Sequence, residues 1–148
     1  MQTKFKVAEI EVSYRPSLTN KIKVDSTEKA YQAFKRFFPK ETICLQEQFM
    51  VMYLNRSGKL IGIYPMSKGG ITSTIVDLRL LLAIALKTAS TSVVLCHNHP
   101  SGNMSPSKAD ISLTQQIKEV AAMFDIRVLD HIIIVAGDKY VSILNTFK

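Results

Sequence analysis

Residues 92–114 read SVVLCHNHPSGNMSPSKADISLT, an apolar run that passes through a Pro- and Gly-containing loop into a helical pattern. His99 precedes Pro100, which steers the backbone of His99 toward the extended region. In extended chain, residues two apart project to the same side, so His97 and His99 point together. Two neutral imidazoles on one side can bind the same ion. The stretch therefore predicts a strand, a loop and a helix, with a metal-binding pair at the end of the strand.

A helix is predicted directly after this loop. We expect Ser105 to cap its start, with Pro106 in the first turn, where a missing amide hydrogen costs nothing. Apolar residues at intervals of three and four define its buried side: Leu113, Ile117, Val120 and Phe124. Asp110 lies on that side, and a buried carboxylate is costly unless a cation compensates it. Ser107 lies one turn before Asp110 on the same side, and it is an alternative helix cap.

Two histidines and one aspartate make three protein ligands and leave the fourth tetrahedral position open, which is typical of catalytic rather than structural zinc. We therefore predict a zinc ion held by His97, His99 and Asp110. Hydrolysis at such a site also needs a group that takes a proton from water and delivers it to the leaving nitrogen. Glu47 is the expected base, because it opens an alternating strand pattern and shares the apolar side of that strand. Glu41 is the alternative.

An upstream Glu followed by His-x-His, seven residues and Ser-x-x-Asp resembles the JAMM signature of the JAB/MPN metallopeptidase-like superfamily. The segments HNHPSG, SPSKADISLT and VLDHIIIV are similar, more narrowly, to the bacterial RadC family, once named for DNA repair. The likeness extends from near Glu41 to the end of the chain. Residues 41–148 are therefore predicted to form a RadC-like JAB/MPN domain, and residues 1–40 a basic strand–helix extension packed on the same domain.

This resemblance implies an α/β protein with a three-layer α-β-α fold and a mixed curved sheet, akin to the cytidine deaminase fold. It implies that His97, His99 and Asp110 bind one zinc ion per chain, and that Glu47 is the acid/base that holds the water. It also implies that Ser107 donates a hydrogen bond to the tetrahedral oxyanion. The implied function is metallopeptidase-like hydrolysis of a peptide or isopeptide bond, with a peptide or protein as substrate. Cytidine deamination is disfavoured, because the chain has no Cys-x-x-Cys motif.

Each of these residues also has a purely structural interpretation. The two histidines could be partly exposed loop residues, with Asp110 favoured at the helix N-terminus by the helix dipole. Glu47 could be a strand-edge carboxylate that pairs with a surface lysine. Ser107 could act as a helix cap alone. The joint spacing of the motif residues favours the metal site over these alternatives.

Asp130 and His131 form a second polar pair within the otherwise apolar run 128–135. Successive strand residues face opposite sides of a sheet, so one of the two is expected to point inward. A hydrogen-bonded core histidine is the favoured interpretation of His131, ahead of a partner behind a metal ligand or a substrate-binding residue. Cys96 alternates with His97 and is predicted to be a small buried side chain on the opposite side of the sheet.

The chain has 148 residues, 47% of them hydrophobic, which is enough for one globular domain with a proper core. It has only two cysteines, which suits a reducing compartment, and residues 1–12 lack the apolar core of a signal peptide. The longest apolar run, residues 80–86, is too short to cross a membrane. We therefore expect a soluble, cytoplasmic protein with no membrane partner.

Basic residues are concentrated near the N-terminus. Residues 1–40 hold nine of the nineteen Lys and Arg against four acidic residues, which is +5 of the net charge of +7. A solvated basic surface is the favoured interpretation, and a nucleic-acid footprint is the alternative. The alternative function is thus a DNA repair or DNA-associated accessory protein whose metal site is structural, vestigial or nucleolytic. Residues 1–40 do not resemble the helix-hairpin-helix region of longer RadC-like proteins.

The remaining pattern predicts the order of the elements. A strand is expected over residues 5–14, followed by a helix that starts with a capping box of Asp25 and Glu28 and ends before Pro39. Further strands are expected at 47–54, 59–64, 70–72, 92–96, 127–135 and 140–144, with a hairpin turn at 55–58 and a largely buried helix at 77–88. Alternating strands and helices predict a mixed sheet with helices on both faces.

Overall fold

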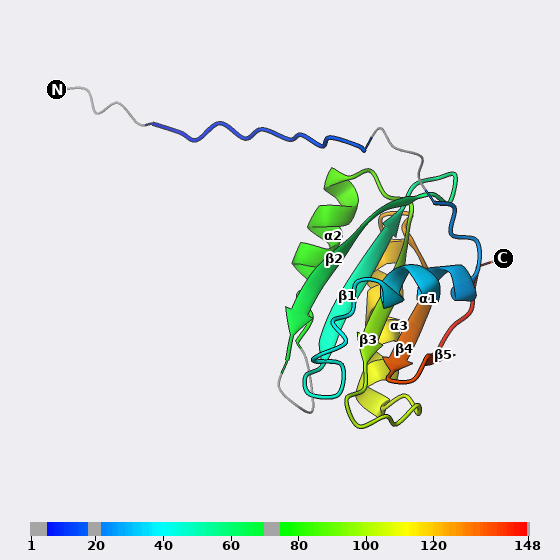
Figure 1. Cartoon of the computed structure of the whole chain (residues 1–148). Coiled ribbons are helices and arrows are strands. Elements are labelled where there is room, and N and C mark those ends of the chain that lie inside the picture. The colour runs from blue at the N-terminus through cyan, green and yellow to red at the C-terminus, as the bar shows by residue number, and fades with distance from the viewer. Residues whose placement is uncertain (1–5, 18–21, 70–74, 148) are drawn as a thin grey trace.

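The computed structural model describes residues 6–17, 22–69 and 75–147 (Figure 1). The helices within them are α1 (Thr27–Lys35), α2 (Leu78–Lys87) and α3 (Lys108–Ala122). One sheet is formed by β1 (Gln48–Leu54), β2 (Leu60–Lys68), β3 (Ser92–Asn98), β4 (Arg127–Val135) and β5 (Lys139–Ser142). The bounds predicted for β4 are those observed. The short strand predicted at 70–72 lies outside the described residues.

The five strands are arranged in the order β2-β1-β3-β4-β5. β3 and β4 are parallel, and the other neighbouring pairs are antiparallel, so the sheet is mixed as predicted. A parallel pair needs a crossover connection, and α3 provides it between β3 and β4. The loop with the histidine motif therefore leads from the carboxyl end of a central strand into the crossover helix. Ligand sites of α/β proteins commonly lie at such an end.

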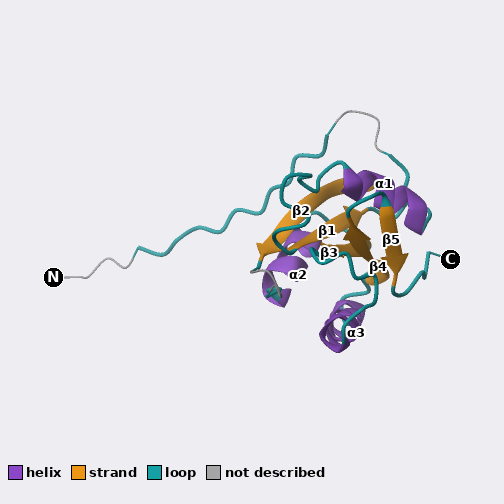
Figure 2. Ribbon diagram, turned by 60° about the horizontal axis from the view of Figure 1, so that its bottom comes forward, coloured by secondary structure: helices purple, strands orange, loops and turns teal. Residues whose placement is uncertain are grey.

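Helices cover both faces of the sheet, which confirms the predicted three-layer arrangement (Figure 2). One core lies between the sheet and α1, and β1 contributes to it Met50, Met52 and Leu54. The other core lies between the sheet and the helices α2 and α3, and β1 contributes to it Phe49, Val51 and Tyr53. β1 is therefore buried along its whole length.

The helix predicted near the N-terminus is present and packs in the same core as the strands. Ser26, rather than Asp25, caps α1, because its side chain accepts a hydrogen bond from the backbone N–H of Lys29. Asp25 forms an exposed ion pair with the Lys29 side chain instead. Phe34 is fully buried against the sheet. This helix is thus an integral part of the layer that covers one face of the sheet.

Residues 6–17 contain neither helix nor strand. The strand predicted over residues 5–14 is therefore wrong for residues 6–14, and residue 5 lies outside the described residues. The segment extends away from the domain (Figure 1), and Val7, Ile10 and Val12 are 85%, 90% and 77% exposed. Alternating apolar residues form a strand only where a neighbouring strand shares their backbone hydrogen bonds. None of the described strands lies beside this segment in the sheet.

α2 is less buried than its apolar sequence predicts. Leu81 and Ala85 are fully buried, but Leu80 and Leu86 are exposed. The helix lies on one face of the sheet, so only the side toward the sheet is covered. In the part of the chain that the structure describes, no helix is both long and apolar enough to cross a membrane.

Candidate metal centre

The antiparallel register of β1 and β3 brings Glu47 and His99 to the same edge of the sheet. Phe49 pairs with His97. Because the strands are antiparallel, the residue two positions before Phe49, Glu47, lies opposite the residue two positions after His97, His99. Phe49 belongs to the core under α2 and α3, and its ring stacks on that of His97 with centroids 6.0 Å apart. Glu47 and His97 therefore lie on the sheet face that α3 covers, whereas Cys96 is buried in the core on the α1 side, as predicted.

A capping box at the start of α3 orients Asp110. The side chain of Ser107 accepts from the backbone N–H of Asp110 (3.0 Å), and the backbone N–H of Ser107 donates to Oδ2 of Asp110 (2.9 Å). Ser107 is therefore the N-cap, and the prediction of Ser105 is wrong. The residue three positions after Ser105 is Lys108, which cannot accept such a hydrogen bond, whereas Asp110 can. Ser105 donates its backbone N–H to the side chain of Asn103 instead.

The buried side of α3 is shifted from the predicted one. Thr114, Ile117 and Ala121 are buried, and Leu113 is only partly buried. Phe124 lies beyond the end of the helix and is exposed. The shift places a polar side chain, that of Thr114, in the interior beside the histidines.

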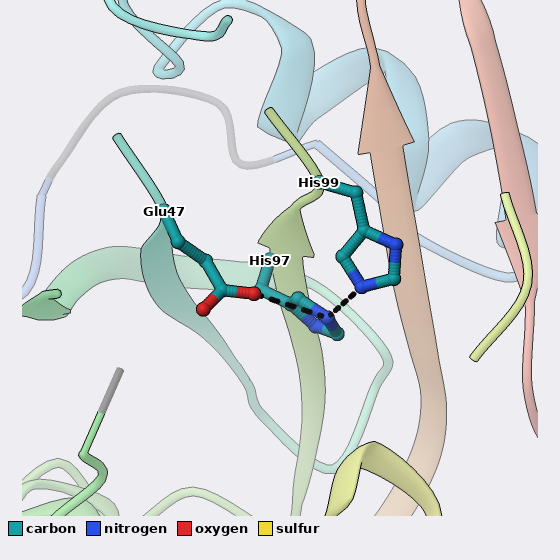
Figure 3. Close-up of side chains that lie close together, drawn as sticks. All are labelled: Glu47, His97 and His99. Carbon is teal, nitrogen blue, oxygen red and sulfur yellow. Dashed lines mark hydrogen bonds and ion pairs between the residues drawn. The ribbon is translucent and has the colours of Figure 1, made fainter. Parts of the chain in front are cut away.

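Two imidazoles and one carboxylate converge at the carboxyl end of β3. Nε2 of His97 lies 3.0 Å from Nε2 of His99 and 3.3 Å from Oδ1 of Asp110. Nε2 of His99 lies 3.1 Å from Oδ2 of Asp110. Figure 3 shows Glu47 and His99 approaching His97 from different directions, with Oε1 of Glu47 3.9 Å from Nε2 of His97. The fold thus brings together four residues that sequence analysis singled out.

These distances fit one tetrahedral metal ion. Zn–N and Zn–O bonds of about 2.0–2.2 Å place neighbouring ligand atoms about 3.3 Å apart. Nδ1 of His99 lies 2.6 Å from the carbonyl oxygen of Asn103, which can only accept, so the neutral ring has its proton on Nδ1 and a lone pair on Nε2. A lone pair that points at a carboxylate is repelled unless a cation lies between them. The donor set therefore suits a divalent metal, and the ligand atoms of Glu47, His97 and His99 also lie within 4.8 Å of one another.

The two carboxyl groups of the site have opposite protonation preferences. Burial raises the pKa of Glu47. A protonated His97 would partly offset this rise, and the carboxylate of Asp110 raises the pKa of Glu47 further. Burial would also raise the pKa of Asp110, but in the absence of metal the imidazoles of His97 and His99 can donate to it when they are protonated on Nε2, and this holds the pKa of Asp110 well below its usual range. Asp110 in turn accepts a hydrogen bond from Nε2 of the protonated His99 ring, which raises the pKa of His99 when no metal is bound. Asp110 is thus ionised, as a metal ligand must be, while Glu47 binds a proton more readily, as a general base must.

A cavity of about 830 Å³ opens onto these groups. Its polar lining includes Glu47, His97, His99, Ser107 and Asp110, and its apolar lining includes Phe49, Val76 and Leu113. Glu41, the alternative base, is exposed and is not among the lining residues. The cavity therefore offers apolar walls for a substrate beside one cluster of polar groups, which is the usual composition of a ligand site.

Asn98, between the two histidines, has a part in the site that sequence analysis missed. Its Oδ1 accepts from the backbone N–H of Gln48 (2.7 Å), and its Nδ2 donates to the carbonyl oxygens of Ile43 (2.8 Å) and Gln46 (2.9 Å). These hydrogen bonds join the end of β3 to the start of β1 and to the segment before it. They hold Glu47 beside the histidines.

Asn98→Asp is expected to lower the free energy of unfolding by about 2–3 kcal/mol, because a buried carboxylate cannot donate to the two carbonyl groups. Thermal unfolding of the wild type and of Asn98→Asp measures this loss of stability. Asn103→Asp is the matched control, because Asn103 lies in an exposed loop and its side chain only accepts a hydrogen bond. Equal stability of the two variants would contradict the part assigned to Asn98.

Both members of the second polar pair, Asp130 and His131, are 0% exposed. We expected only one of the two side chains to point inward. Both are buried, because helices cover both faces of the sheet. Asp130 accepts a hydrogen bond from Thr27 of α1. His131 is a hydrogen-bonded core histidine, as favoured. Its Nε2 lies 2.7 Å from Nδ1 of His97, which is also the contact that the alternative interpretation, a partner behind a metal ligand, requires. Burial keeps the pKa of His131 well below its ordinary value, so its ring is neutral.

Comparison with known proteins shows the family of this chain. The family model of the RadC-like JAB domain matches residues 24–146, which include α1, all five strands and the histidine motif. The chain belongs to the RadC-like JAB domain family. This confirms the resemblance to the RadC family and the JAB/MPN superfamily that the motif indicated.

Several relatives of this RadC-like JAB domain have the name UPF0758 protein, which states no activity. One from Flavobacterium johnsoniae is 38% identical over 94% of this chain and 60% of its own length. One from Porphyromonas gingivalis is 35% identical over 92% of this chain and 60% of its own length. One from Variovorax paradoxus is 43% identical over 64% of this chain and 42% of its own length. The chain thus spans 60% or less of the length of these relatives.

Proposed function

We propose that this RadC-like JAB domain is a zinc-dependent hydrolase that cleaves an amide bond in a peptide or isopeptide linkage. The observation that carries the proposal is the convergence of two imidazoles and one carboxylate, with a second, buried carboxyl group just outside them. Structural zinc sites are closed by four protein ligands, whereas hydrolytic sites have three and keep one position open. An open position beside a general base is what metal-dependent hydrolysis requires.

His97, His99 and Asp110 would hold one zinc ion per chain. When bound, zinc supplies Lewis acidity, which polarises the amide carbonyl and lowers the pKa of water. Glu47 is the proposed general base: its carboxylate takes a proton from the attacking water and delivers it to the leaving nitrogen as the C–N bond breaks. Its Oε1 lies 3.9 Å from Nε2 of His97, farther than the spacing of the three ligands, which suits a group that contacts the water rather than the metal.

Ser107 is the proposed hydrogen-bond donor to the oxyanion. Its Oγ accepts from the backbone N–H of Asp110, which leaves the hydroxyl proton available for donation. Ser107 also lines the cavity that Glu47 lines. Helix capping and oxyanion stabilisation are therefore compatible in one residue.

Metal analysis combined with a hydrolysis assay tests this function. The wild type is expected to bind about one zinc ion per chain, and His97→Ala and Asp110→Ala are expected to lose it. The zinc-loaded wild type should cleave a member of a panel of fluorescein-labelled casein and isopeptide-linked lysine peptides. A chelator should abolish the cleavage, and added zinc should restore it. A wild type that binds no zinc, or that binds zinc and cleaves nothing in the panel, would overturn the proposal.

The alternative of a DNA-associated protein gains no support from the basic residues of α1. Lys29 pairs with Asp25, and Lys35 pairs with Asp138. These ion pairs reduce the charge that the two lysines offer to phosphate groups. Duplex affinity that falls steeply with salt concentration would favour the alternative.

A further inference from the structure

Behind His97, a chain of hydrogen-bonding side chains runs through the core to the backbone of Asp110. Nδ1 of His97 lies 2.7 Å from Nε2 of His131, and Nδ1 of His131 lies 2.5 Å from Oγ1 of Thr114. Oγ1 of Thr114 lies 2.7 Å from the carbonyl oxygen of Asp110, one helical turn earlier. All three side chains are buried, so bulk water does not compete for these contacts.

The direction of each hydrogen bond follows from the chemistry of Thr114. A carbonyl oxygen only accepts, so the single hydroxyl proton of Thr114 is donated to Asp110. Oγ1 must then accept from His131, which places the proton of His131 on Nδ1. A neutral imidazole that donates through Nδ1 accepts through Nε2. His97 must therefore donate through its own Nδ1, and its Nε2 presents a lone pair toward the candidate metal position.

We propose that Thr114 and His131 are positioning residues that set the tautomer of His97 and prepare its Nε2 to bind metal. The inference rests on the proposed function, because metal binding by His97 is part of that function. If the chain of hydrogen bonds ran in the opposite direction, Nε2 of His97 would carry the proton and could not bind the ion. Oγ1 of Thr114 and the carbonyl oxygen of Asp110 would then face each other without a proton between them.

The two histidines reach the same tautomer by different routes. His99 donates through Nδ1 to the carbonyl oxygen of Asn103, four residues away in its own loop. His97 lies within β3, and its Nδ1 partner comes from β4. Because Thr114 also contacts the backbone of Asp110, the same chain of contacts couples the ligands of β3 and α3. Such partners behind metal ligands fix the orientation of the ring and raise its basicity.

Zinc affinity of substituted chains tests the inference. Thr114→Val removes the hydroxyl group and keeps the shape of the side chain, whereas Thr114→Ser keeps the hydroxyl. Thr27→Val is the matched control, because it removes another buried hydroxyl, one that donates to Asp130 at the other face of the sheet. In competition with a chelating dye, Thr114→Val should bind zinc about 10- to 100-fold more weakly than the wild type. Thr114→Ser and Thr27→Val should stay within about threefold of the wild type.

The tautomer can also be measured directly in the metal-free wild type. Long-range ¹H–¹⁵N NMR distinguishes a protonated ring nitrogen from one with a lone pair. We expect the proton of His97 on Nδ1, and we expect this preference to weaken in Thr114→Val. An unprotonated Nδ1 in the wild-type His97 would overturn the inference whether or not zinc binds and whether or not Thr114→Val folds.

The outcomes separate this inference from the proposed function. A folded Thr114→Val chain that binds zinc as tightly as the wild type would overturn the inference and leave the hydrolase proposal standing. Weaker zinc binding by Thr114→Val, in a protein whose wild type cleaves no substrate, would support the inference and count against hydrolysis. His131→Gln adds a rescue, because its amide can accept from His97 and donate to Thr114, and it should therefore bind zinc more tightly than His131→Leu.

Discussion

Asp130→Ala is expected to lower the free energy of unfolding by about 3–5 kcal/mol. Asp130 is fully buried. Its carboxylate accepts hydrogen bonds from the hydroxyls of Thr27 and Ser142 and from the backbone N–H groups of His131, Leu144 and Asn145. Alanine would leave the buried donors of Thr27 and His131 without their acceptor, and each such loss costs about 1–3 kcal/mol, whereas the other three donors are only partly buried and lose less. The carboxylate also joins the start of α1 to β4, β5 and the segment after β5. Urea-induced unfolding measures the loss.

Asp138→Ala is the control for this substitution. Asp138 is an exposed carboxylate that forms a surface ion pair with Lys35 and has a left-handed φ of 59°, which alanine tolerates less well, so this substitution should cost no more than about 1–2 kcal/mol. Asp130→Asn keeps Oδ1 as the acceptor for the backbone N–H groups, and it should fall between the two alanine variants. Similar unfolding midpoints for Asp130→Ala and Asp138→Ala would contradict the part assigned to Asp130.

Alternation and spacing predicted most of this fold, because the central strands are buried and strongly apolar. β4 is the clearest case, since it begins and ends where its apolar run does. The same reasoning failed for residues 6–14, because alternation indicates strand propensity, whereas a strand also needs a neighbour for its backbone hydrogen bonds. It also overestimated the burial of α2, because apolar composition does not determine how much of a helix the rest of the fold covers.

The candidate site was predictable where its geometry is local. His97 and His99 are two residues apart in extended chain, and Asp110 lies in the first turn of the next helix, so spacing alone brings them together. Asn98 and His131 were different, because their partners are 50 and 34 residues away in the sequence. Only the pairing of β3 with β1 and β4 creates those contacts. The pattern of β4 singled out His131 as a polar residue in an apolar run, but it could not show the contact with His97, and no pattern in β3 indicated the role of Asn98.

Glu47→Gln is expected to lower kcat for amide hydrolysis by about 10²- to 10⁴-fold while the chain still binds about one zinc ion. Glutamine has nearly the same shape but cannot take a proton from water. Zinc should stay bound because the three proposed ligands, His97, His99 and Asp110, are intact and lie closer to one another than Glu47 lies to His97. The measurements are zinc content and the initial rate on the substrate that the zinc-loaded wild type cleaves.

Glu41→Gln provides the matched control for Glu47→Gln, because it makes the same chemical change six residues earlier at an exposed position. It should retain wild-type zinc content and wild-type kcat. Thermal unfolding separates a chemical defect from loss of structure: Glu47→Gln removes a buried charge from the protein, so its melting temperature should equal or exceed that of the wild type. Full activity in Glu47→Gln together with loss of activity in Glu41→Gln would transfer the role of general base to Glu41. Full activity in both variants would remove the carboxylate base from the mechanism, because water would then be activated without either side chain.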